Sequence, residues 1–137
     1  VKGITRLLPS RLEEVDITLF DALEAGDVLF IDSSHVSKTG SDVNFLFFEL
    51  LPRLKPGVYV HLHDIFLPDE YPKPWVLGEE RSWNEQYMLH AFLMFNREWR
   101  TVWMAHYMLS RHLDAVSAVF PRCPALGTGG SFWMQRS

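Results

Sequence analysis

Residues 28–35 read VLFIDSSH, and residues 58–64 read VYVHLHD. Each stretch is a short apolar run that leads into an aspartate, Asp32 in the first and Asp64 in the second. An unbroken apolar run of this length is typical of a strand buried on both faces, as in parallel sheets. In open α/β sheets, ligands bind in the crevice at the carboxyl ends of the strands. We therefore expect the two carboxylates to share one site.

The segment between these two runs has the periodicity of a helix. Apolar residues recur at three- and four-residue spacing across residues 41–54, and Ser41 is a suitable N-cap. Residues 55–57 (KPG) end this helix. Strand, helix and strand form a βαβ unit, in which the two strands are parallel neighbours. The fold class is therefore α/β.

The rest of the chain continues the α/β pattern. Residues 82–85 (SWNE) match a capping box, which predicts a helix to about Asn96. Further elements are predicted as a short strand or extended segment at 16–20, a strand at 99–108, a helix at 110–120 and a strand at 131–135. Residues 66–81 are rich in prolines, acids and aromatics. This segment is expected to be an ordered loop, which either covers the site as a lid or only packs on the helix.

The composition is that of one compact globular domain over residues 1–137. Of these residues 47% are hydrophobic, and the formal net charge is −4. Lysines and arginines are scattered singly, which argues against nucleic acid as a partner. No apolar stretch reaches the roughly 18 residues needed to span a bilayer, and the amino terminus lacks the apolar segment of a signal peptide. We expect a soluble, cytoplasmic protein in which the single cysteine, Cys123, is structural or incidental.

Side-chain chemistry at the two strand ends indicates a metal site. The carboxylates of Asp32 and Asp64 would repel each other unless a proton or a cation lies between them. Hard oxygen ligands favour Mg²⁺, Mn²⁺ or Ca²⁺. His63 becomes a further candidate ligand if the chain bends at the end of the strand. His35, three residues after Asp32, is a candidate base for a hydroxyl group.

Structural roles compete with these assignments. Asp32 can instead cap the turn that follows it, through the amides of Ser33 and Ser34. His61 lies on the same side of its strand as Tyr59 and is expected to be a hydrogen-bonded core histidine. The remaining histidines are expected to be structural or solvated; they are His90 in a helix, His106 in a strand and His112 near a helix start.

Several motifs together resemble a known family. They are residues 26–35 (GDVLFIDSSH), 54–58 (LKPGV), 63–66 (HDIF), 83–87 (WNEQY) and 129–133 (GGSFW). Together they resemble a class I S-adenosylmethionine-dependent methyltransferase of methyltransferase family 24, which is related to the macrolide-sugar and catechol O-methyltransferases. The resemblance begins near Asp16 and covers only the second half of the Rossmann-like fold, in which parallel strands are followed by a terminal antiparallel strand.

The resemblance implies that S-adenosylmethionine donates a methyl group to a small-molecule hydroxyl, on a sugar or a secondary metabolite. It places divalent-metal ligands at Asp32 and Asp64, with Mg²⁺ or Mn²⁺ expected rather than Zn²⁺, and the catalytic base at His35. Relatives often carry an acidic or amide residue at the position of His63, so this histidine would shift the metal preference or abolish metal binding. The family's glycine-rich cofactor turn is missing. Residues 127–130 (GTGG) indicate only a turn into the last strand, and no cofactor-binding residue is assigned.

Half of a fold would leave the strand at 28–31 with an exposed apolar edge, which invites association. We therefore expect either a missing amino-terminal half or a homo-oligomer, and enzymatic activity of the chain by itself is left open. Two other functions also stay open. One is a zinc-dependent hydrolase that uses His61, His63 and Asp64, and the other is a non-catalytic oligomerising module. The sequence leaves undecided the methyl acceptor, the metal and the oligomer size.

Overall fold

The computed structural model describes residues 3–122 and 129–137. Its centre is a four-stranded sheet in the order β1-β2-β4-β3. The strands are β1 (Val28–Ile31), β2 (Tyr59–Leu62), β3 (Trp99–Met104) and β4 (Phe132–Arg136). β1 and β2 are parallel, whereas β4 is antiparallel to both of its neighbours. This mixed α/β arrangement, with one antiparallel strand at the end of the chain, agrees with the prediction.

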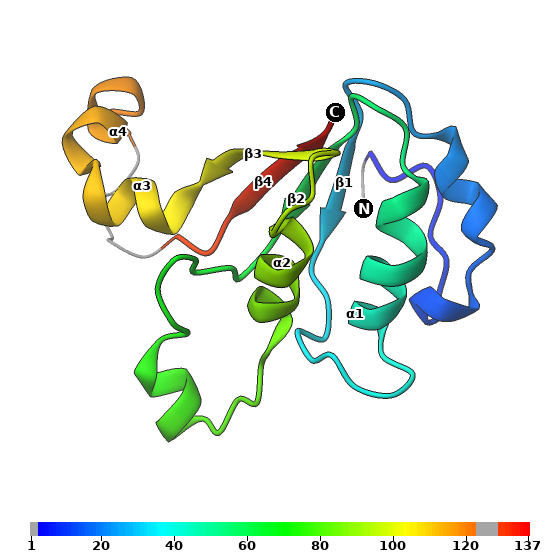
Figure 1. Ribbon diagram of the computed structural model, residues 1–137, viewed down its shortest axis with the longest axis horizontal. Helices are drawn as coiled ribbons and strands as arrows, with labels where there is room; N and C mark the ends of the chain where they lie inside the picture. The colour runs from blue at the N-terminus through cyan, green and yellow to red at the C-terminus, as the bar shows by residue number, and fades with distance from the viewer. Residues whose placement is uncertain (1–2, 123–128) are drawn as a thin grey trace.

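The helical segments are short and lie on two sides of the molecule. In Figure 1, α1 stands beside β1 and α2 lies below the middle of the sheet, while α3 and α4 lie beyond the end of β3. The α-helices are α1 (Asp42–Phe45), α2 (Glu85–Leu93), α3 (Ala105–Arg111) and α4 (Leu113–Val119). The 3₁₀ and π segments are Leu12–Glu14, Ile17–Ala22, Leu46–Leu50, Leu51–Arg53 and Pro74–Gly78.

The hydrophobic core lies between the sheet and the helical segments around α1 and α2. Its fully buried members include Val60, Leu62 and Met134 from the strands and Val43, Leu50 and Leu89 from the helices. Phe47 and Phe92 join the two helical layers edge to face, with ring centroids 5.5 Å apart. Each buried aliphatic or aromatic side chain contributes about 1.5–3 kcal/mol, so this core fixes the layer that supports the ends of β1 and β2.

The helix predicted over residues 41–54 is confirmed, with Ser41 as its N-cap. The Ser41 hydroxyl accepts a hydrogen bond from the Asn44 N–H at 3.3 Å. The hydrogen-bond pattern then changes along the segment, from α to π over Leu46–Leu50 and to 3₁₀ over Leu51–Arg53. Pro52 has no N–H to donate, so the regular α-helical ladder cannot pass through it.

The prediction that β1 is buried on both faces is wrong. Ile31 is 5% exposed, but Val28 is 49% and Phe30 54% exposed. β1 is the edge strand of the sheet, and its side chains alternate between the covered face and the opposite face. Val28 and Phe30 therefore form an apolar surface on the opposite face.

The predicted capping box at residues 82–85 is also wrong. α2 begins at Glu85 with Asn84 as its N-cap, and the Asn84 side chain makes no capping hydrogen bond to the helix. The first amides of the helix donate instead to a backbone carbonyl, that of His35, from Asn84 at 2.9 Å and from Glu85 at 3.2 Å. The helix ends at Leu93, before the predicted boundary.

Two further segments differ from the predictions. β3 ends at Met104, and a new helix starts at once, so His106 is helical and not in a strand. The segment at 16–20, predicted as extended, lies largely in the 3₁₀ helix Ile17–Ala22, which the Asp16 side chain caps through the Thr18 amide. Cys123 and residues 127–128 lie outside the described residues.

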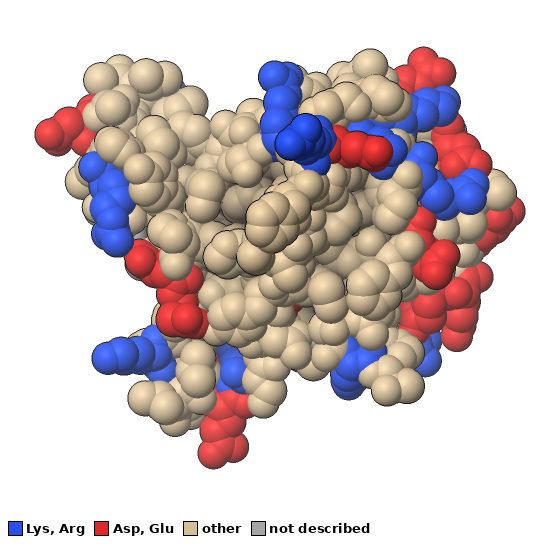
Figure 2. Space-filling model, viewed as in Figure 1, with Lys and Arg blue, Asp and Glu red and all other residues tan. Residues whose placement is uncertain are grey.

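Charged side chains lie mainly around the rim of the face shown in Figure 2, and its centre is formed by other residue types. Acidic and basic groups both occur along this rim. Among the described residues, no helix is long and apolar enough to cross a membrane.

Candidate functional site

The carboxyl ends of β1 and β2 bring the four predicted site residues together. His35 Nε2 lies 3.5 Å from Oδ1 of Asp32 and 4.0 Å from Oδ2 of Asp64. His63 Nδ1 lies 3.1 Å from Oδ1 of Asp64 and 3.9 Å from Oδ1 of Asp32. This convergence is the result expected for parallel neighbouring strands.

Backbone turns at both strand ends aim these side chains at one another. His35 and Asp64 have φ values of 58° and 56°, in the left-handed region that residues other than glycine rarely adopt. The bend at Asp64 interrupts the strand alternation, so His63 and Asp64 both reach the site. Strained residues of this kind cluster at functional sites, and here two of them lie side by side.

The loop after β1 is held by an acidic residue of α1. Asp42 accepts hydrogen bonds from the Ser34 N–H at 2.8 Å and from the Ser34 hydroxyl at 2.5 Å. Burial raises the pKa of Asp42, but these hydrogen bonds outweigh it and lower the pKa below its usual value. The Ser34 amide therefore donates to Asp42 and not to Asp32. The Asp32 carboxylate faces His35 and His63 instead.

The site runs from a buried histidine to an exposed carboxylate. The side chain of His35 is 6% exposed, that of Asp64 19% and that of Asp32 58%. The indole of Trp83 covers the His35 ring, with centroids 4.1 Å apart and planes inclined by 35°. His35 is therefore shielded on one side and open toward the carboxylates.

A further residue of the site is Glu85, which the sequence places in the predicted capping box. Its Oε2 lies 2.8 Å from Nδ1 of His35, and its side chain is 1% exposed. Burial lowers the pKa of His35, but the hydrogen bond and charge of Glu85, together with Asp64 and Asp32, raise it above the ordinary value. The imidazolium form of His35 would thus relieve the repulsion between the two aspartates.

The donor set of Asp32, His63 and Asp64 suits a divalent cation chemically, with two carboxylates and one imidazole. Over residues 3–122 and 129–137, no three His, Cys, Asp or Glu side chains are arranged as ligands of one metal ion. The two carboxylates converge on His35 Nε2 instead. Metal binding would require these side chains to turn from the histidine toward the ion.

His61 is a hydrogen-bonded histidine, as predicted, and it lies apart from this charge cluster. Its Nε2 is 2.7 Å from the Ser131 hydroxyl, and its ring stacks on Trp133 at 4.4 Å. Burial, and then the neighbouring His63, lower the pKa of His61. A zinc site built on His61 and His63 would need this Nε2 or the opposite ring nitrogen, and the Nε2 is already bonded to Ser131.

The loop after β2 is ordered by contacts at both of its ends. Asp69 accepts from His106 Nε2 at 2.9 Å, and the Tyr71 hydroxyl accepts from the Gln86 N–H at 3.0 Å. The guanidinium of Arg81 contacts two indoles, 4.2 Å from the Trp75 ring and 4.5 Å from the Trp83 ring, and these two rings also pack edge to face on each other. Trp83, which follows this loop, also covers His35, so the loop is connected to the site through the Trp83 side chain.

The other histidines take structural or solvated positions. His106 packs against Phe66 and pairs with Asp69, and His112 lies 3.3 Å from the Tyr107 hydroxyl. His90 is exposed on α2. None of these contacts connects them to the cluster around His35.

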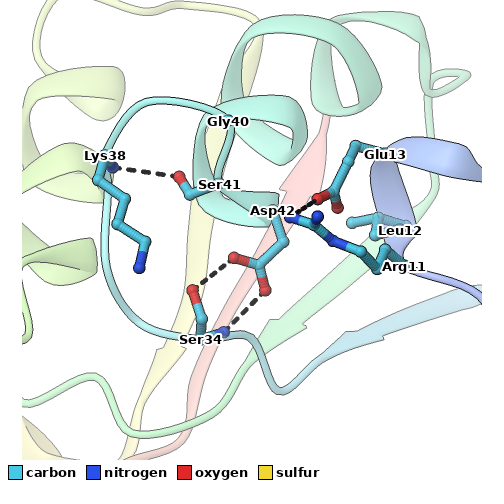
Figure 3. A pocket seen from close by; sticks show the side chains of 8 residues that line it. All are labelled: Arg11, Leu12, Glu13, Ser34, Lys38, Gly40, Ser41 and Asp42. Carbon is cyan, nitrogen blue, oxygen red and sulfur yellow. Dashed lines mark hydrogen bonds and ion pairs between the residues drawn. The ribbon is translucent and has the colours of Figure 1, made fainter.

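Two cavities flank the loop that follows β1. The cavity in Figure 3 has a volume of about 300 Å³, and its polar lining includes Ser34, Lys38 and Asp42. The second, of about 260 Å³, runs along β1 and is lined by Phe30, Asp32 and apolar residues of the helical layer. A small ligand could therefore lie beside the exposed carboxylate of Asp32.

Residues 2–65 match the family model Methyltransf_24, described as a methyltransferase domain. The matched range contains both strand ends and therefore Asp32, His35, His63 and Asp64. No curated protein and no solved structure matches the chain. The resemblance seen in the sequence is confirmed over the matched range, and the family implies S-adenosylmethionine as the cofactor.

Proposed function

Since residues 2–65 belong to a methyltransferase domain family, we propose that the protein transfers a methyl group from S-adenosylmethionine to a hydroxyl group of a small molecule, such as a sugar or a secondary metabolite. Methyl transfer to oxygen requires in-line approach and removal of the hydroxyl proton. The observation that supports this function is the position of His35, whose Nε2 faces two carboxylates at the carboxyl end of a parallel strand pair.

In this proposal, His35 is the general base. Neutral His35 accepts the hydroxyl proton at Nε2, and the negative charges of Asp32 and Asp64 stabilise the imidazolium that forms. Asp64 is the better placed of the two aspartates for this task, because its side chain is 19% exposed and Asp32 is 58% exposed. Charges that are partly removed from water interact more strongly.

We also propose a divalent ion, Mg²⁺ or Mn²⁺ rather than Zn²⁺, held by Asp32, His63 and Asp64. A metal bound there would polarise the acceptor oxygen and lower the pKa of its hydroxyl. The imidazole of His63 is a ligand that suits transition metals, so it shifts the preference of this site away from Mg²⁺.

The residues that would hold S-adenosylmethionine are not assigned. Within residues 3–65, the described part of the matched range, the connection from β1 to α1 is the only link from a strand to an α-helix, and it contains a single glycine, Gly40. A phosphate- or cofactor-cradling turn normally carries several glycines. We propose that this chain forms the second half of a Rossmann-like domain and that the cofactor is held mainly by another segment. We also propose that the partner of this chain is a second copy of itself, bound through the apolar surface of Val28 and Phe30.

Labelled methyl transfer tests the proposed function. The 137-residue chain, and a version extended by whatever its gene encodes upstream of Val1, are incubated with methyl-labelled S-adenosylmethionine, Mn²⁺ and a panel of sugars and catechols. We expect labelled product from at least one version and one acceptor. His35→Gln should lower the rate about 10²- to 10⁴-fold, which is the usual contribution of a general base.

His90→Gln is the matched control, because His90 is exposed on α2 and should leave the rate unchanged. A His35→Gln variant with full activity would contradict the role of the base. Absence of labelled product from both versions with every acceptor would contradict the methyltransferase proposal. Stoichiometric zinc that is lost in His61→Ala would favour the hydrolase, and absence of any metal or cofactor binding would favour the non-catalytic module.

A further inference from the structure

The first residues of α2 are hydrogen-bonded to both the backbone and the side chain of His35, which lies in the loop after β1. The His35 carbonyl accepts the amides of Asn84 and Glu85, and the Glu85 carboxylate reaches the imidazole at 2.8 Å. Both side chains are buried, Glu85 at 1% and His35 at 6% exposure. A carboxylate placed so far from water is stable only when it is paired and hydrogen-bonded.

His35 provides the hydrogen bond that pairs the buried Glu85 carboxylate. Among the residues that the structure describes, the Oε1 atom of Glu85 is buried without a hydrogen-bond partner. The Oε2 atom is bonded to Nδ1 of His35. A carboxylate can only accept, so the ring nitrogen that faces it must carry the proton. The position of Glu85 therefore decides which of the two imidazole nitrogens is protonated.

We propose that Glu85 is a positioning residue that holds neutral His35 in the Nδ1–H tautomer. The opposite nitrogen, Nε2, then keeps its lone pair and faces Asp32 and Asp64, where a hydroxyl proton would be taken up. A hydrogen bond at one nitrogen of a histidine sets the state of the other. The Trp83 ring, inclined by 35° with its centroid 4.1 Å from that of the imidazole, packs against His35 and restrains its rotation. The catalytic use of the tautomer rests on the proposed function, whereas the tautomer itself does not.

A second acid–histidine pair supplies an internal control. In that pair, His106 directs Nε2, not Nδ1, to the carboxylate of Asp69, at 2.9 Å. The same reasoning predicts the opposite tautomer, Nε2–H, for His106. The two histidines should therefore give different nitrogen spectra in one sample.

Nitrogen NMR of the ¹⁵N-histidine-labelled 137-residue chain tests the proposal without cofactor or acceptor. Spectra are recorded near pH 9, about 2.5 units above the ordinary histidine pKa, and His35→Gln assigns the signal. We expect a protonated Nδ1 and an unprotonated Nε2 for His35. In Glu85→Gln this preference should be lost, because the amide can also donate to the ring. Asp69→Asn should change the His106 signal and leave that of His35 unchanged.

An Nε2–H tautomer for His35 in the wild-type chain would overturn the proposal, and so would a tautomer unaffected in folded Glu85→Gln. The wild-type spectrum decides the matter even if that variant fails to fold. For the active protein, we expect Glu85→Gln to lower kcat at least tenfold with little change in KM. Because the spectrum needs no methyl transfer, a wrong tautomer and an inactive protein are separate outcomes.

Discussion

Gly130 packs against Asp64 so closely that a Cβ atom on the glycine would lie 2.8 Å from the Cα of Asp64 and 3.1 Å from its Oδ1. The Gly130 carbonyl also accepts the Ile65 N–H at 2.9 Å. The turn before β4 is thereby laid against the end of β2, at the position where Asp64 adopts its positive φ. Only a residue without a side chain permits this contact.

Gly130→Ala should destabilise the fold by about 1–3 kcal/mol, because backbone atoms of Asp64 must move to admit the methyl group. Gly78→Ala is the control, since nothing lies within 4 Å of a Cβ at that glycine. Its effect should stay within about 0.5 kcal/mol. Urea denaturation measures both variants, and equal stability of the two would show that the contact with Asp64 is not tight.

Asp42→Asn should destabilise the protein by about 1 kcal/mol at neutral pH, since the charged acceptor of two Ser34 hydrogen bonds is lost. The pKa of Asp42 is lowered in the folded state, so its contribution is fully present above the unfolded pKa of about 3.8 and is lost as the pH falls through the folded value. The difference between wild type and variant should therefore close at low pH. Thermal unfolding across a pH series measures it.

Ser34→Ala provides the partner variant for this prediction. It removes the hydroxyl donor and keeps the backbone donor, so its cost should be smaller than that of Asp42→Asn. The double variant should cost less than the sum of the two, because the residues share one interaction. Additive effects, or a stability difference that persists at low pH, would contradict the role of Asp42.

Arg81→Met should loosen the loop after β2. The guanidinium contacts the indoles of both Trp75 and Trp83, and such contacts contribute about 0.5–1 kcal/mol at exposed sites. We expect amide hydrogen exchange over Pro74–Gly78 to become about two- to fivefold faster. Arg97→Met, at an exposed arginine before β3, should leave that exchange unchanged. Unchanged exchange in both variants would mean that the contacts of Arg81 with the indoles do not hold the loop.

Phe30→Lys should prevent self-association of the chain. Phe30 is 54% exposed on the edge strand, and association through the surface that it forms with Val28 would bury both side chains. Phe95→Lys is the control, because Phe95 is 95% exposed on the turn after α2. Sedimentation velocity should find an oligomer for the wild type and for Phe95→Lys, and a monomer for Phe30→Lys. A well-folded, monodisperse wild-type monomer would contradict association between copies.

The βαβ unit could be predicted from the sequence because its signals are local. Apolar runs of strand length flank a helical periodicity that begins at Ser41, and parallel pairing then follows from chain connectivity. The meeting of Asp32, His35, His63 and Asp64 could be predicted for the same reason, because parallel neighbours end at the same edge of a sheet.

The contacts that complete the site could not be predicted, because they join residues distant in sequence. Glu85 fits a local capping motif, yet its carboxylate bonds to His35, fifty positions away. The closeness of Gly130 to Asp64 depends in the same way on how β4 inserts beside β2. Exposure of Phe30 was mispredicted because an apolar run does not say which neighbour covers a strand.

Paramagnetic broadening by Mn²⁺ tests most directly whether the two strand ends share one cation site. At substoichiometric Mn²⁺, the imidazole signals of His35 and His63 should broaden first, while those of His90 and His112 stay sharp. Asp64→Asn should remove this selectivity. If Mn²⁺ leaves His35 and His63 as sharp as the other histidines, or broadens all of them equally, the ends of β1 and β2 do not form the proposed site.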